Sequence, residues 1–88
     1  LYSNFPNPFN PSTTILYALP EKSHVSIEIY DILGKRIKVL VSKSQNMGHH
    51  SKIWDGTNEH GEIVSGGVYI YVLNAGSYYD SKKMIYMK

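Results

Sequence analysis

The chain has no cysteine among its 88 residues, which excludes a disulfide framework and a thiolate metal site. Packing alone must therefore stabilise the fold. An excess of one charge is also lacking, because 9 basic and 7 acidic residues leave a net charge of only +2. These charges are spread along the chain, so the basic patch typical of nucleic-acid-binding proteins is missing. We expect no nucleic-acid partner.

Long apolar runs are absent as well. No stretch approaches the roughly 18 apolar residues of a membrane span, so we expect no membrane span. The chain does not open at Leu1 with the charged and then apolar pattern of a secretory signal peptide. We expect residues 1–88 to be a single domain excised from a larger protein, and if that protein is exported its signal lies upstream.

Helical periodicity is also absent. Apolar residues recur with a period of two, in short runs separated by Gly, Pro, Asn and Asp, which is typical of half-buried strands. Such runs at spacings of roughly 8 to 12 residues predict an all-β fold, an antiparallel immunoglobulin-like β-sandwich, with a small barrel as the competitor. The seven expected strands are residues 13–19, 25–30, 36–41, 49–54, 63–64, 68–73 and 78–87.

The best-defined core positions lie on the second expected strand. Val25, Ile27 and Ile29 alternate with polar residues and give one apolar face. Trp54 should be the largest single contributor to the core, because burying such a ring stabilises a fold by roughly 3 kcal/mol or more. Residues 68–73 are apolar on both faces, as expected of a central strand.

Two irregular segments are expected. Prolines fix φ and lack an N–H, so the proline-rich residues 4–11 should form an extended lead-in whose Phe5 and Phe9 plug the edge of the core. The polar residues 42–48 are expected to cross from the third strand to the fourth. A last hairpin turn is predicted at residues 74–77.

Motifs of catalysis are missing. There is no Gly-x-Ser-x-Gly elbow, and a chain of this size with its large residues committed to a core leaves little room for a catalytic pocket. We expect no enzyme activity and no cofactor.

The histidines do not predict a metal site. His49 and His50 are adjacent, so on a strand they point to opposite faces, and His24 and His60 belong to separate expected turns. The loop 55–62 offers oxygen ligands suited to Ca²⁺, but it departs from the Asp-x-Asp-x-Asp-Gly ligand pattern. A hydrogen-bonded turn is the preferred interpretation there.

Five motifs, in order and spacing, point to a family. They lie at residues 4–15, 29–35, 54–56, 61 with 64–69, and 83–84. Together they resemble the type A C-terminal sorting domain of the type IX (Por) secretion system, and the same architecture is similar to the Ig-like domain of flagellar hook-capping proteins. Phe5 departs from that pattern, since Tyr is common there.

The resemblance implies a role in protein export rather than catalysis. Proteins with such a domain are exported to the periplasm, recognised by the outer-membrane secretion machinery, and released or attached at the cell surface. The partners it implies are that machinery and an upstream passenger domain in the same chain. By carry-over from the family, the residues of partner recognition are Gly67, Val68, Tyr69, Lys83, Met84, Ile85, Tyr86, Met87 and Lys88.

Edge-strand chemistry suggests how residues 83–88 could be recognised. A terminal strand with free N–H and C=O groups can be extended by a strand of a receptor, while alternate side chains supply selectivity. The simpler interpretation is a last structural strand with solvated lysines.

The main alternative function is a carbohydrate-binding module. Exposed aromatic rings on a sandwich face can stack on sugar rings. The candidates for such a platform are Tyr69, Tyr71, Tyr78, Tyr79 and Tyr86. If instead Tyr69 and Tyr71 pack in the core, only Tyr78 or Tyr79 would be exposed. A structural Ig-like spacer is a third possibility.

Overall fold

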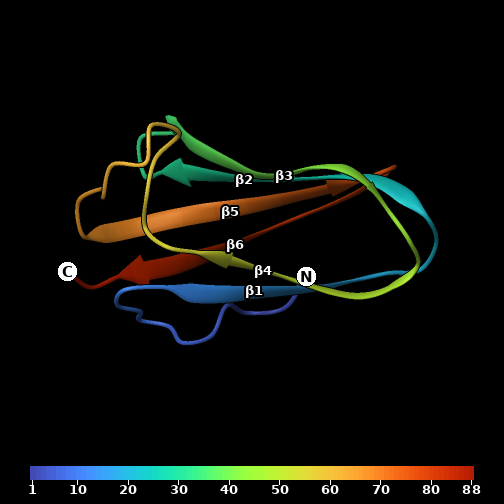
Figure 1. Ribbon diagram of the computed structural model, residues 1–88, viewed down its shortest axis with the longest axis horizontal. Helices are drawn as coiled ribbons and strands as arrows, with labels where there is room; N and C mark the ends of the chain where they lie inside the picture. Colours follow the sequence, from blue (N-terminus) through green and yellow to red (C-terminus); the bar gives the residue numbers. More distant parts are fainter.

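The computed structural model describes residues 1–88 as six strands with no helix (Figure 1). No helix is therefore available that could cross a membrane. The strands are β1 (Thr13–Leu19), β2 (Ser23–Asp31), β3 (Arg36–Gln45), β4 (Gly48–Trp54), β5 (Gly67–Ala75) and β6 (Tyr78–Tyr86).

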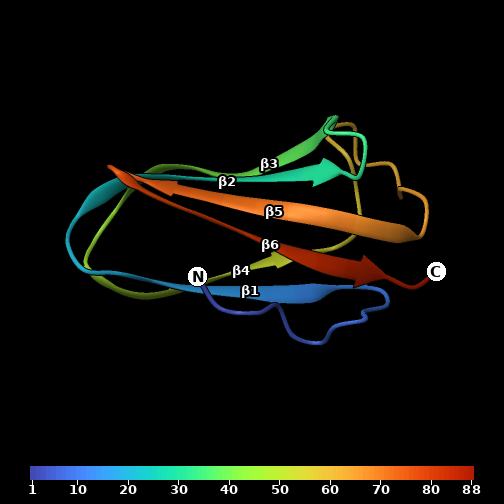
Figure 2. The same cartoon turned by 180° about the vertical axis from the view of Figure 1, so that it is seen from behind.

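Two antiparallel sheets face each other, as Figures 1 and 2 show from opposite sides. One sheet pairs β1 with β4, and the other has the order β3-β2-β5-β6. The predicted all-β antiparallel sandwich is confirmed, and β5 is a central strand as expected. β6 lies at the edge of the larger sheet, where strand β5 is its partner along its whole length.

The seventh expected strand, at residues 63–64, does not form. Ile63 makes only a single bridge to Thr57, because the chain between them folds into a tight loop. In that loop Asn58 Oδ1 accepts hydrogen bonds from the amides of His60 and Glu62, at 2.9 and 3.0 Å. A side chain that satisfies two amides of its own loop removes the need for a strand partner.

β3 is longer than predicted, and the prediction that residues 42–48 cross from the third strand to the fourth is wrong. Ser42 pairs with Ser26 and Gln45 with Ser23, so only Asn46 and Met47 lie between β3 and β4. The serines suggest a loop in the sequence, but β3 is an edge strand with a solvated side, where polar residues are common within a strand.

Two adjoining clusters form the core. Val25, Ile27 and Ile29 are all fully buried, which confirms the predicted face of β2. Trp54 is also fully buried, as predicted. The first cluster contains Phe9, Ile15, Ile29, Trp54, Tyr69, Tyr71, Met84 and Tyr86. The second contains Tyr17, Leu19, Val25, Ile27, Val41, Leu73 and Ala75.

The predicted lead-in at residues 4–11 is irregular as expected, and in the structure it extends over residues 1–12. Only one of its two phenylalanines enters the core. Phe9 is 1% exposed, whereas Phe5 is 75% exposed. The difference follows from where each backbone is held. Phe5 pairs with Thr14 on β1, and its ring points to solvent, while Phe9 bridges to Tyr86 on β6, between the two sheets.

Candidate interaction site at the carboxyl-terminal strand

The fold pairs the two segments that the family resemblance singles out, although residues 70–82 separate them in the sequence. In the β5–β6 register Gly67 lies opposite Tyr86, Val68 opposite Ile85, and Tyr69 opposite Met84. Residues 67–69 and 83–86 therefore form one continuous surface at the edge of the larger sheet. Met87 and Lys88 follow the end of β6.

Alternation along β6 divides these residues into two groups. Tyr69, Met84 and Tyr86 are buried in the first core cluster, so they shape the site from beneath. Val68 is half-buried on the outer face. The residues that a partner could touch directly are exposed: Gly67, Lys83, Ile85, Met87 and Lys88.

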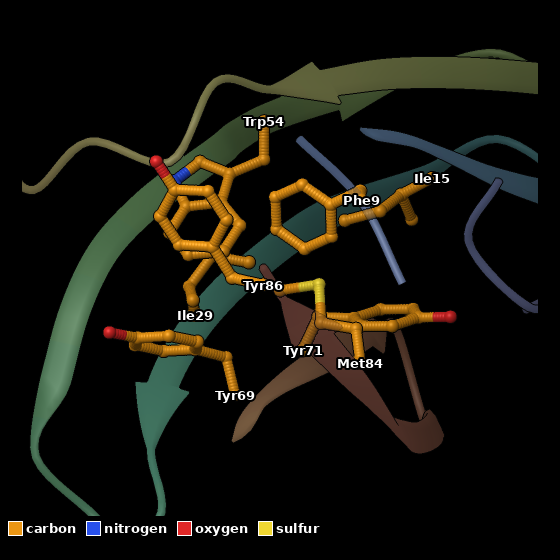
Figure 3. Packing of buried hydrophobic residues seen from close by; sticks show 8 residues of the cluster. All are labelled: Phe9, Ile15, Ile29, Trp54, Tyr69, Tyr71, Met84 and Tyr86. Atoms are coloured by element: carbon orange, nitrogen blue, oxygen red, sulfur yellow. The ribbon is translucent and has the colours of Figure 1, made fainter. Parts of the chain in front are cut away.

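An aromatic cluster supports the end of β6 from inside. The Phe9 ring stacks on Tyr86 with centroids 4.9 Å apart and an interplanar angle of 7°. Trp54 lies edge-on to Tyr69 at 5.2 Å and to Tyr86 at 6.2 Å. Figure 3 shows these rings converging from the lead-in, β4, β5 and β6. Aromatic pairs of this kind are worth about 0.5–1.5 kcal/mol each beyond the area they bury.

Two glycines make room for the same end of the chain. A Cβ at Gly56 would lie 2.9 Å from the Tyr86 ring, and Gly56 also has φ = +77°. A Cβ at Gly66 would lie 3.1 Å from Cβ of Lys88 and 3.2 Å from the carbonyl oxygen of Tyr86. The glycines of the predicted motifs thus let Tyr86 and Lys88 approach the backbone closely.

The outer edge of β6 is covered at its carboxyl end, so the expectation of a free edge over residues 83–88 is wrong there. The amide of Phe9 donates to the carbonyl of Ile85 at 3.0 Å, and the amide of Met87 donates to the carbonyl of Phe9 at 2.9 Å. Asn7 Oδ1 accepts the amide of Ile85 at 2.9 Å. The lead-in runs beside β1 toward this end of the molecule (Figures 1 and 2).

Tyr71 anchors the lead-in from the centre of the larger sheet. Its hydroxyl accepts the amide of Asn4 and donates to the carbonyl of Tyr2, both at 2.9 Å. Burial raises the pKa of Tyr71 above 10.0, so the hydroxyl stays protonated and able to donate. Asn4 Nδ2 in turn donates to Thr13 Oγ1 at 3.0 Å. The lead-in is therefore tied both to β1 and to the core.

A shorter stretch of the β6 edge stays open. Because Ile85 directs its N–H and C=O away from β5, the alternation of an antiparallel ladder directs those of Tyr79, Ser81 and Lys83 outward too. All three side chains are exposed, and no strand pairs with this side of β6. The Ser81 amide is bonded only to the carboxylate of Asp80, at 2.8 Å.

The structure does not gather the tyrosines into an aromatic platform for sugars. Tyr69, Tyr71 and Tyr86 are 6%, 0% and 5% exposed. Tyr78 and Tyr79 are exposed, but as neighbours on a strand they point to opposite faces. The alternative in which Tyr69 and Tyr71 belong to the core is the one the structure bears out.

Oxygen atoms of loop 55–62 accept hydrogen bonds both from the loop itself and from neighbouring residues such as Lys38 and Val39. Asp55 Oδ1 accepts the Thr57 hydroxyl at 2.5 Å, and this bond is the main reason that the pKa of Asp55 is lowered. Asn58 Oδ1 binds two amides, as described above. The structure holds no group of three or more His, Cys, Asp or Glu side chains able to bind a metal ion. Contrary to expectation, His24 lies within β2 rather than in a turn.

One open groove of about 670 Å³ lies between the β2–β3 turn and residues 58–65. Its carboxylates are already bonded inside the protein: Glu59 accepts the amide of Val39, and Glu62 accepts Asn58 Nδ2. Ile37, Val64 and Tyr69 are among the apolar residues that line it.

Sequence reasoning missed the role of the lead-in. Asn7 and Phe9 cover the end of β6, and Asn4 connects Tyr71 with Thr13. Residues 4–15 belong to one of the five motifs, but nothing local in them says that their partner lies at the opposite end of the chain. Only the tertiary contact reveals that the two terminal segments form one unit.

Solved structures show where similar domains occur. PorU from Porphyromonas gingivalis, solved as a latent dimer, matches with TM-score 0.74 and 26% identity, over 97% of this chain and 9% of that chain. PorZ, an essential surface component of the type IX secretion system of the same bacterium, matches with TM-score 0.69 and 19% identity, over 98% and 11%. FlgD from Xanthomonas campestris, a protein of flagellar hook capping, matches with TM-score 0.67 and 24% identity, over 90% and 58%.

The two matches below 25% identity establish the fold alone. The chain spans less than two thirds of each of these proteins, and about a tenth of PorU and PorZ. A comparison with curated proteins gives no match. The model of the FlgD Ig-like domain family matches residues 10–78, well over half of the chain. The protein therefore belongs to the FlgD Ig-like domain family, with the immunoglobulin-like sandwich that its sequence predicts.

Proposed function

We propose that residues 1–88 are a non-catalytic sorting domain that directs an upstream passenger across the outer membrane through the type IX secretion system. The passenger would reach the periplasm first and then the cell surface or the medium. The outer-membrane secretion machinery is the proposed partner. Any catalysis would belong to the passenger.

Two observations support this proposal. The five motifs resemble those of type IX sorting domains along the whole chain. PorU and PorZ contain a domain of the same fold that makes up about a tenth of each chain, as expected of a module joined to other domains. Family membership fixes the fold but does not distinguish sorting from a flagellar role.

The observation that carries the proposal is the convergence of two motif segments at one place. Residues 67–69 pair with residues 84–86, and both rest on the same aromatic cluster. This arrangement presents Lys83, Ile85 and Met87 on the surface while their neighbours fix the backbone. A receptor could thus identify the folded domain by its last strand.

A reporter fusion tests the proposal. Residues 1–88 would be placed after a signal-peptide-bearing reporter in a host with the type IX machinery. Deleting residues 83–88 is a poor probe, because it also removes the buried Met84 and Tyr86 and so unfolds the domain. We would instead change three exposed positions together, with K83S, I85S and M87S. Export should fall by about tenfold or more, because the recognised side chains are gone.

The matched control is L16S with I53S, which alters exposed apolar residues of the other sheet, 43% and 61% exposed. This control should export like the unchanged domain. Both purified domains should unfold cooperatively, which excludes misfolding as the cause. Reporter retained in the periplasm with the unchanged domain would reject the sorting function.

A structural role in a capping assembly is the second candidate. It is favoured by the family match and by the coverage of 58% of FlgD from X. campestris. In that case the reporter would stay in the periplasm with every variant. The domain would then be expected to assemble with axial flagellar proteins, which co-purification of the parent protein would detect.

A further inference from the structure

We propose that the open edge of β6 is a docking site for a second copy of the same chain, paired antiparallel about a two-fold axis at Ser81. Two such edges would join into one continuous sheet. This inference is independent of the sorting function, since it depends only on the geometry and sequence of β6.

The backbone supplies the first part of the argument. Tyr79, Ser81 and Lys83 each direct one N–H and one C=O away from β5, and the lead-in covers the edge only from Ile85 onward. An uncovered edge of this kind is a template for another strand. With Ser81 opposite its own copy, Tyr79 lies opposite Lys83 of the other chain, and every outward group of the stretch gains a partner.

The charges select this register. About Ser81, Asp80 lies opposite Lys82 of the other copy, and the reverse pair follows by symmetry. If the two-fold axis moves by one residue toward the start of β6, Asp80 lies opposite Asp80 of the other copy. If it moves by one residue toward the end, Lys82 lies opposite Lys82. Unlike charges across a strand pair attract and like charges repel, so only the register centred on Ser81 is favoured.

The side chains that flank the axis also fit. Tyr79 is 63% exposed, and Lys83 is exposed on the same outer face, so each tyrosine ring meets a lysine across the interface. Neither Lys82 nor Lys83 forms an ion pair within its own chain. Asp80 holds the Ser81 amide at 2.8 Å in the single copy, and on pairing it would exchange that bond for Lys82 of the partner copy.

Sedimentation velocity on residues 1–88, over a range of concentrations, tests the proposal. We expect a monomer–dimer equilibrium that weakens as salt is added, because the Asp80–Lys82 pairs are solvent-accessible. S81P should abolish the dimer by removing the central outward N–H while leaving the bonds between β5 and β6 intact. A dimer that persists in S81P, or a chain that stays monomeric at millimolar concentration, would overturn the inference.

A charge exchange provides the decisive control. D80K alone and K82D alone should each weaken self-association by about tenfold or more, because each places like charges opposite each other. The double variant D80K/K82D has the composition of the unchanged chain and should restore the dimer. An equimolar mixture of the two single variants should form a heterodimer. No recovery in either case would contradict the Ser81 register.

Amide hydrogen exchange locates the interface. The Ser81 and Lys83 amides should become protected as concentration rises, whereas the exposed β4 strand of the other sheet should not change. Protection at β4 with none at Ser81 would assign the dimer to a different face.

Discussion

At the scale of the residue, Gly56 is the position where backbone and side-chain constraints coincide. It has φ = +77°, and a Cβ would meet the Tyr86 ring at 2.9 Å. We expect G56A to lower the free energy of unfolding by about 3 kcal/mol, from backbone strain and overpacking together. G61A is the matched control, because Gly61 has φ = +78° with no atom within 4 Å. It should cost only about 1 kcal/mol in the same urea titration. Equal losses would show that the contact with Tyr86 is unimportant.

The buried tyrosines give stability a dependence on alkaline pH. Burial raises the pKa values of Tyr17, Tyr69 and Tyr71 above 10.0 in the folded state. The unfolded chain therefore loses these protons first as pH rises. The stability that the protonated tyrosines contribute to the fold is complete below pH 10.0, and it is lost as pH passes through the higher pKa values of the folded state. Urea midpoints should be level from about pH 7 to 9 and fall above about pH 10. The urea midpoint of Y71F should fall less steeply with pH than that of the unchanged chain. An identical slope would exclude Tyr71 as a source of the pH dependence.

At the scale of the element, the lead-in acts as a cover for β6. F9A removes a ring that stacks on Tyr86 and contacts Trp54, and it leaves a cavity between the sheets. The free energy of unfolding should fall by about 3–5 kcal/mol. F5A, which changes the exposed phenylalanine of the same segment, should shift it by less than about 0.5 kcal/mol.

Amide hydrogen exchange distinguishes local protection of β6 by the lead-in from the global stability of the fold. In a less disruptive variant, N7A, the Ile85 amide loses its acceptor and should exchange faster than in the unchanged chain. The β2 amides opposite β5 should keep their rates, since N7A leaves the core intact. Unchanged exchange at Ile85 would mean that the lead-in does not protect this edge in solution.

At the scale of the whole molecule, the two core clusters share Leu1 and Leu40, which pack against both. We therefore expect one cooperative unfolding transition rather than two. Trp54 fluorescence reports on the first cluster, and far-UV circular dichroism reports on all strands. Their urea midpoints should coincide. A fluorescence change that comes first would show that the cluster beneath β6 opens on its own.

The all-β class, the alternating face of β2, the burial of Trp54 and the central place of β5 are predictable from the sequence alone. These features depend on period-two patterning and on side-chain size, which neighbouring residues express directly. The resemblance of motifs also identified residues 67–69 and 83–88 as segments of interest before their pairing was known.

How the ends of the chain meet depends on tertiary contacts. Phe9 rather than Phe5 is buried, the lead-in covers Ile85 and Met87, and the open part of the β6 edge is limited to Tyr79–Lys83. These outcomes depend on contacts between residues more than 60 positions apart. No local sequence pattern encodes which of two phenylalanines such a contact will bury, or which stretch of a strand edge it will cover.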